Sequence, residues 1–86
     1  MAYEVVVVRS AERELKGLSI EARRRIASRL LELAVDPHPA QSIRFRGIEG
    51  FRLRVGDYRI IYNVDDVLHV VTNLAMGHRR HIYRDM

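Results

Sequence analysis

The stretch Phe51-Arg52-Leu53-Arg54-Val55-Gly56-Asp57-Tyr58-Arg59-Ile60-Ile61-Tyr62 predicts two β-strands joined by a tight turn at Gly56-Asp57. Glycine at the first central position of a two-residue loop favours a type II′ hairpin turn. With that turn the register of the two strands follows. The expected facing pairs are Val55 with Tyr58, Arg54 with Arg59, Leu53 with Ile60, Arg52 with Ile61, and Phe51 with Tyr62.

The two faces of this hairpin differ, because side chains alternate across a strand. One face carries Phe51, Leu53, Val55, Tyr58, Ile60 and Tyr62. The other carries Arg52, Arg54 and Arg59, with Ile61 among them. Two arginines directly opposite each other repel and destabilise the strand pair. A fold does not need that arrangement, whereas a bound phosphate backbone explains it; the alternative is an ordinary solvent-facing surface.

The length of 86 residues predicts one small domain, residues 1–86, and the 48% of apolar residues are enough for a core without staples. The chain has no cysteine, which excludes a disulfide framework and a thiolate metal site. Its histidines show no metal-ligand spacing. No signal peptide is apparent, so we expect a cytoplasmic protein, and the valine run 5–8 is too short to span a membrane.

The basic charge consists almost entirely of arginine. The formal net charge is +4, with fourteen arginines and one lysine among the fifteen basic residues. Arginine binds phosphate or carboxylate through two parallel hydrogen bonds, so this balance fits an RNA, DNA or acidic-protein partner, and it fits a charge-rich soluble surface equally well. Residues 41–62 and 76–86 are the most basic segments. They supply the candidate RNA-binding residues Arg44, Arg46, His78, Arg80 and His81.

The first half of the chain predicts a strand followed by a helical hairpin. Residues 3–9 include four consecutive valines, which favours a central strand buried on both faces. Ser10 is the expected N-cap of a short helix that ends at Gly17. Ser19 is the expected N-cap of a second helix over about residues 20–35. The apolar stripe expected on that helix contains Ile26, Ala27, Leu30, Leu31 and Ala34.

The second half predicts strands without helices. We expect a short edge strand over 42–46, a turn over 47–50, the hairpin, a turn near 63–66, a strand over 67–75 and one helical turn over 76–84. This order predicts an α+β fold with an antiparallel three- to four-stranded meander. The helix stripe should cover the apolar face of the hairpin. The arginine face then stays open, which is where a ligand would sit.

The hairpin, followed after one more strand by Gly77-His78-Arg79-Arg80-His81-Ile82-Tyr83, resembles the RelE branch of the RelE/ParE toxin superfamily. The first half is similar too, with a strand, then Ser10-Ala11-Glu12-Arg13-Glu14-Leu15-Lys16-Gly17-Leu18 and a second helix. The similarity covers essentially the whole chain. It implies a RelE-like fold and the toxin of a type II toxin–antitoxin system.

The resemblance also implies an activity. RelE-like toxins enter the ribosomal A site and cleave messenger RNA without a metal or cofactor. The ribose 2′-hydroxyl attacks the adjacent phosphate and leaves a 2′,3′-cyclic phosphate and a 5′-hydroxyl. The functional positions of the family correspond here to Arg52, Arg54 and Arg59 on the hairpin and to Arg79 and Tyr83 near the end of the chain.

The partners implied by the resemblance are the ribosome, messenger RNA and a cognate antitoxin. The antitoxin would form a hetero-oligomer with the toxin by folding onto the arginine face or by displacing the C-terminal tail. The pair would then bind its own operator through the antitoxin.

One departure from the family concerns proton transfer. The first two hairpin positions are often lysine in the ribonucleases, whereas both are arginine here. Arginine cannot be deprotonated in a protein, so the base would be Tyr83, His78, His81 or a ribosomal group. Two other functions stay open. One is a ParE-like inhibitor of DNA gyrase, which does not require this arginine and tyrosine set, and the other is a non-catalytic RNA- or protein-binding module.

Overall fold

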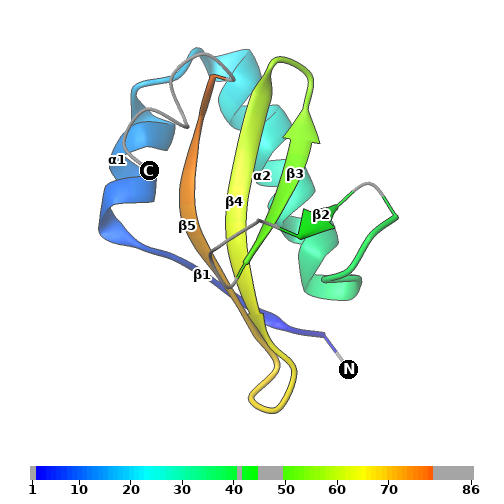
Figure 1. Cartoon of the computed structure of the whole chain (residues 1–86). Coiled ribbons are helices and arrows are strands. Elements are labelled where there is room, and N and C mark those ends of the chain that lie inside the picture. The colour runs from blue at the N-terminus through cyan, green and yellow to red at the C-terminus, as the bar shows by residue number, and fades with distance from the viewer. Residues whose placement is uncertain (1, 41, 45–49, 79–86) are drawn as a thin grey trace.

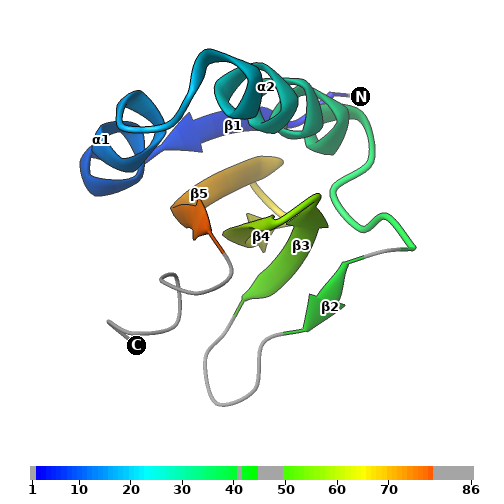
Figure 2. The same ribbon diagram turned by 90° about the horizontal axis from the view of Figure 1, so that it is seen from above.

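The computed structural model describes residues 2–40, 42–44 and 50–78. Two helices cover one face of a five-stranded sheet and leave the other face open (Figures 1 and 2). The predicted α+β class is confirmed. The elements in chain order are β1 (Glu4–Val7), α1 (Arg9–Lys16), α2 (Ile20–Val35), β2 (Ile43–Arg44), β3 (Phe51–Val55), β4 (Tyr58–Asp65) and β5 (Val70–His78).

The first strand lies at an edge of the sheet and not at its centre. The strand order is β1-β5-β4-β3-β2, with β1 parallel to β5 and every other neighbour antiparallel. Burial is one-sided, because Val5 and Val7 are half-buried while Glu4 and Val6 are exposed. The prediction of a central strand buried on both faces is therefore wrong. The valine run indicates a strand, but it does not determine how many neighbours the strand has.

The helices begin and end close to the predicted residues. The N-cap of α2 is Ser19, whose Oγ accepts a hydrogen bond from the backbone N–H of Ala22 at 3.2 Å. Helix α1 starts two residues earlier than expected, with Val8 as N-cap, so the prediction that Ser10 caps it is wrong. Gly17 ends α1, as predicted. Within the described part of the chain, neither helix is long and apolar enough to cross a membrane.

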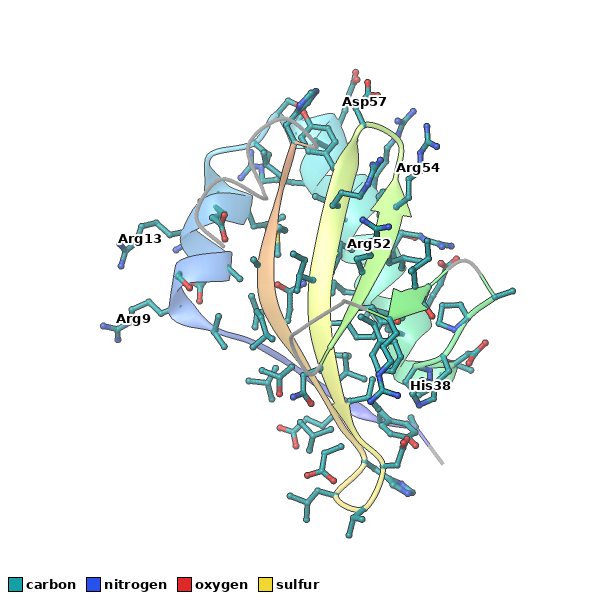
Figure 3. All side chains as sticks on the ribbon, in the orientation of Figure 1. Arg9, Arg13, His38, Arg52, Arg54 and Asp57 are labelled. Atoms are coloured by element: carbon teal, nitrogen blue, oxygen red, sulfur yellow. The ribbon has the colours of Figure 1, made fainter. Side chains whose placement is uncertain are left out.

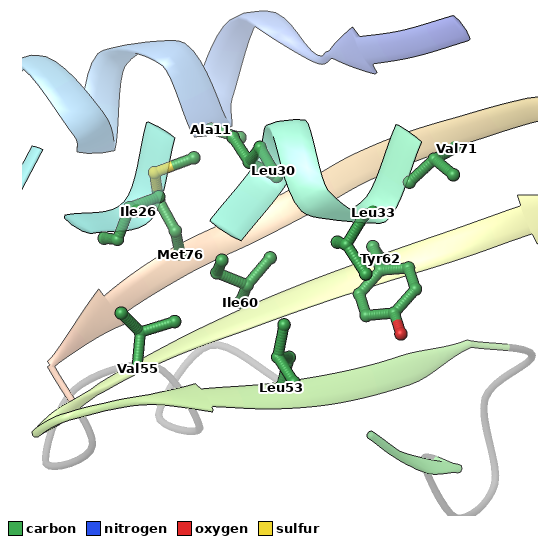
Figure 4. Close-up of a cluster of buried hydrophobic side chains, with 10 residues drawn as sticks. All are labelled: Ala11, Ile26, Leu30, Leu33, Leu53, Val55, Ile60, Tyr62, Val71 and Met76. Atoms are coloured by element: carbon green, nitrogen blue, oxygen red, sulfur yellow. The ribbon is translucent and has the colours of Figure 1, made fainter. Parts of the chain in front are cut away.

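The core lies between α2 and the apolar face of the hairpin, as predicted (Figure 4). The buried stripe of α2 consists of Ala22, Ile26, Leu30 and Leu33. The expectation for Leu31 and Ala27 is wrong, since both are exposed, with Leu31 at 71%. The predicted and the observed stripe share Ile26 and Leu30. The observed stripe is rotated about the helix axis by roughly the angle between consecutive residues. From the sheet, the buried residues of this cluster are Leu53, Val55, Ile60, Tyr62, Val71 and Met76.

The boundary between the last two strands lies later than predicted. The carboxylate Oδ1 of Asp65 accepts hydrogen bonds from the backbone N–H groups of Val67 at 3.0 Å and Leu68 at 2.9 Å. His69 adopts a left-handed conformation with φ 57°. Both features belong to a turn, so β5 starts at Val70 and not at residue 67. The helical turn expected over 76–84 is wrong for residues 76–78, which continue β5, and its remaining residues lie outside the described ones.

A small polar cluster ties three segments together at the end of the sheet away from the hairpin turn. The Tyr3 hydroxyl donates a hydrogen bond to Oδ1 of Asp66 at 2.7 Å, and Nε2 of His38 lies 3.3 Å from the same oxygen. The Tyr3 ring also stacks on His69. The hydrogen bond from Tyr3, followed by that from His38, lowers the pKa of the Asp66 carboxyl. The cluster therefore holds the N-terminal segment against the β4–β5 turn.

We predict that Tyr3→Phe raises the pKa of Asp66 towards its ordinary value, because the strongest hydrogen bond to the carboxylate is lost. A carboxyl with a lowered pKa in the folded state contributes stability that is full above its unfolded-state pKa. That stability is lost as pH falls through the folded-state pKa. NMR titration of the side-chain carboxyl carbon measures the shift. An unchanged Asp66 pKa in Tyr3→Phe would contradict the assignment, and Tyr58→Phe serves as the control.

Candidate nucleic-acid interface

The hairpin between β3 and β4 has the predicted register. Arg52 pairs with Ile61, Arg54 with Arg59, and the other three pairs are also as expected. Gly56 has φ +60°, whereas Asp57 does not have a positive φ, which is the pattern that a type II′ turn requires. Since directly opposed residues share a face, the three hairpin arginines project from the face that the helices leave open.

Strand β5 forms the neighbouring part of this open face. Gly77 lies opposite Arg59, and Ala75 lies opposite Ile61. Glycine has no side chain and that of alanine is a methyl group, so β5 adds little bulk beside Arg59, which is half-buried, and beside Ile61, which is 1% exposed. Figure 1 looks onto this face, and Figure 3 shows Arg52 and Arg54 along β3. Strand β5 also reaches the sheet end that carries the hairpin turn, where His78 pairs with Tyr58.

Arg54 and Arg59 form a close pair of like charges. They form the next pair after Val55 and Tyr58, which flank the turn. Paired residues that exchange no backbone hydrogen bonds, as expected at this position, have Cα atoms about 4.5 Å apart. Nε of Arg54 donates a hydrogen bond to the Gly56 carbonyl oxygen at 3.2 Å. Nη1 of Arg59 donates to the same oxygen at 3.4 Å and to the Tyr58 carbonyl oxygen at 3.0 Å. Main-chain carbonyl groups therefore hold both guanidinium groups. Neither group forms an ion pair with a carboxylate of the described residues.

Two of the predicted RNA-binding residues lie elsewhere. Arg44 pairs with Phe51, so by register it shares the face of the sheet that the helices cover and not the face of Arg52. His78 pairs with Tyr58 on that same face, with the two rings edge to face at 5.7 Å between centroids. The structure does not bring either residue together with the hairpin arginines. For His78 this weakens its candidacy as the base.

The remaining predicted site residues lie outside the described residues. They are Arg46, Arg79, Arg80, His81 and Tyr83. Their roles stay predictions from the sequence. Among the described residues, no group of three or more histidine, aspartate or glutamate side chains could hold a metal ion.

The structure adds one arginine, Arg25, to the residues near the hairpin turn. Arg25 lies on α2 and reaches the hairpin turn, where its Nη1 would be 3.3 Å from a Cβ atom built on Gly56. In the sequence it is one of three consecutive arginines that resemble a solvated helix face. Arg25 lies three residues after the buried Ala22, so it is at the flank of the packed stripe of α2. This spacing is the sequence signal that could have identified Arg25.

The fold closely matches those of known toxins. A chain of the toxin–antitoxin complex RelBE2 from Mycobacterium tuberculosis has a TM-score of 0.83 and 26% identity, over 92% of this chain and 100% of that one. A chain of the archaeal RelE–RelB complex from Pyrococcus horikoshii OT3 has a TM-score of 0.82 and 28% identity, over 94% and 99%. A chain of the intact E. coli RelBE complex has a TM-score of 0.76 and 27% identity, over 90% and 96%.

The family follows from the sequence comparison. The model described as the ParE toxin of type II toxin–antitoxin systems, parDE, matches residues 5–83. The chain belongs to this family and is a type II toxin of the RelE/ParE superfamily. The membership that the hairpin and terminal motifs predicted is thereby confirmed at the level of the superfamily. None of the curated proteins matches the chain.

We predict an unfavourable coupling energy between Arg54 and Arg59. In a double-mutant cycle of Arg54→Gln and Arg59→Gln, urea unfolding should give a destabilising coupling of about 0.2–1 kcal/mol. The coupling should shrink when the salt concentration approaches about 1 M, where the screening length is about 3 Å. The matched control is the diagonal pair Arg52 and Arg59, which should couple more weakly. A stabilising coupling, or one that salt does not change, would show that the pair is structural.

Proposed function

We propose that the chain is a ribosome-dependent endoribonuclease that cleaves messenger RNA in the A site. The observation that carries this proposal is the open face with Arg52, Arg54 and Arg59, two of which are directly opposed and bound only to main-chain carbonyls among the described residues. Such an arrangement lowers the stability of an empty hairpin. It is favourable once the negative charge of a phosphate backbone neutralises it.

The chemistry assigned to these arginines is stabilisation of charge. Attack of the 2′-oxygen on phosphorus forms one P–O bond while the bond to the 5′-oxygen breaks, and the phosphorane between these states carries additional negative charge. Arg52, Arg54 and Arg59 would bind the phosphoryl oxygens and stabilise that charge. We place Arg79 in the same role from the sequence motif.

Proton transfer requires other groups. The 2′-hydroxyl proton must pass to a base, and the leaving 5′-oxygen must receive a proton from an acid. The hairpin arginines can do neither, because a guanidinium keeps its proton at any relevant pH. We therefore assign the base to Tyr83, His81 or a ribosomal group. Since the described histidine His78 lies against Tyr58 on the other face, it is the weakest of the candidates.

The proposed partner is a cognate antitoxin. The similar structures from Mycobacterium tuberculosis, Pyrococcus horikoshii and E. coli are complexes of RelE-type toxins with RelB-type antitoxins. By analogy this chain would form a hetero-oligomer with its own antitoxin, with an acidic segment of the partner over the arginine face. Action on ribosomes would take place in the cytoplasm.

A second candidate function is inhibition of DNA gyrase. The matching family model is named for ParE toxins, and the resemblance to ParE-type toxins implies an inhibitor of gyrase without nuclease activity. That function does not require arginines directly opposed on the open face. The arginine face therefore favours the ribonuclease.

The test is induced expression in a bacterial host, followed by mapping of RNA ends. We predict growth arrest and cuts in ribosome-bound messages that end in 2′,3′-cyclic phosphate. Arg59→Ala should reduce cleavage by about 10²-fold or more, as expected for loss of one transition-state contact. The matched control is Arg13→Ala, which removes the same charge from α1 on the far side of the molecule (Figure 3). Growth arrest with intact messages and blocked DNA supercoiling would favour the gyrase function.

A further inference from the structure

Three arginines from three different elements meet at one glycine. Arg54 on β3 and Arg59 on β4 donate to the carbonyl oxygen of Gly56, and Arg25 on α2 approaches the same residue from the helix side. Arg54 and Arg59 meet at Gly56 through the hairpin itself, whereas Arg25 is distant in the sequence and comes close because α2 packs behind the hairpin (Figure 1). We call this group the turn cluster: Arg25, Arg54, Arg59 and Gly56.

The turn cluster concentrates positive charge where the fold gains little from it. Arg25 is exposed and forms no ion pair with a described carboxylate. Arg29, one turn further along the same helix, is paired with Glu32 at 2.7 Å. Glu21 lies one turn before Arg25 on the same helix, but no ion pair between the two is formed, in contrast to Arg29 and Glu32. Asp57 in the same turn supplies one negative charge against the three positive ones, so the turn keeps a net positive charge that a bound anion can neutralise.

Glycine at position 56 makes the close approach of Arg25 possible. Its φ of +60° already disfavours other residues. In addition, a Cβ atom there would lie 3.3 Å from Nη1 of Arg25, which is tighter than an ordinary contact. The side chain of Arg25 thus lies directly over bare backbone.

We propose that the turn cluster is a second phosphate-binding position for single-stranded RNA, with Arg25 as its distinguishing residue. Arg54 and Arg59 would contribute to both positions, and Arg25 would bind a phosphate that has passed over the turn to the helix side. The RNA strand would accordingly run across the tip of the hairpin and not along the β3 edge of the sheet. This rests on the proposed function only in taking RNA as the ligand; cleavage is not required.

The experiment measures binding of a fluorescent 2′-O-methyl oligoribonucleotide to the intact chain. This probe lacks the attacking hydroxyl, so cleavage cannot interfere. Kd is determined for the wild type, Arg25→Gln and Arg24→Gln at several salt concentrations. The Arg24→Gln control removes the same charge from the neighbouring exposed position, which does not contact Gly56. Free energies of unfolding are measured for all three proteins.

Arg25→Gln should weaken binding and lower the slope of log Kd against log salt by about 0.7, the value for one single-strand phosphate contact. The ratio of the Arg25→Gln Kd to the wild-type Kd should therefore fall about 2.5-fold between about 50 mM and about 200 mM salt. Arg24→Gln should keep the wild-type slope. Arg25→Lys should restore the slope, because the charge returns.

Equal effects of Arg25→Gln and Arg24→Gln would overturn the inference, since they would indicate general attraction by a basic helix. An unchanged Kd in Arg25→Gln would also overturn it. These outcomes are separate from the fate of the proposed nuclease. If the wild type does not cleave messages but Arg25→Gln alone loses a phosphate contact, the binding position stands and the nuclease does not.

Discussion

The guanidinium groups of Arg54 and Arg59 are held opposite each other on neighbouring strands, and both donate to the carbonyl oxygen of Gly56. The repulsion between them works against the hairpin. The opposite face of the same strands compensates, because Leu53 and Ile60 are almost fully buried under α2. Burial of each such side chain contributes about 1.5–3 kcal/mol, more than an exposed like-charge pair removes. The apolar face therefore lets the hairpin present its arginines.

The rest of the fold is consistent with this division of the hairpin into two faces. Both helices cover the apolar face, and the small residues Ala75 and Gly77 of β5 continue the open one. Helix α2 does more than bury the core, because its flank carries Arg25 to the hairpin turn. At the other end of the sheet, the cluster of Tyr3, His38 and Asp66 holds the N-terminal segment in place. The proposed binding site and the anchoring cluster thus lie at opposite ends of the strands.

Local rules in the sequence were enough for the hairpin register and for the Ser19 cap of α2, because both depend on residues a few positions apart. These rules failed where contacts between segments distant in the sequence determine the structure. The edge position of β1 depends on its pairing with β5, and no property of the valine run encodes that partner. The start of β5 depends on Asp65, which closes a turn by accepting two backbone hydrogen bonds. Arg25 was missed because its neighbour Gly56 becomes adjacent only after α2 packs.

The central claim is that the open hairpin face binds RNA through its arginines. The most direct measurement is NMR of the arginine Nε–Hε groups during titration with a 2′-O-methyl oligoribonucleotide. The signals of Arg54 and Arg59 should shift together and saturate with one Kd, while those of Arg9 and Arg13 on α1 should stay in place (Figure 3). Shifts that are equal for all these arginines, or largest on α1, would contradict the claim.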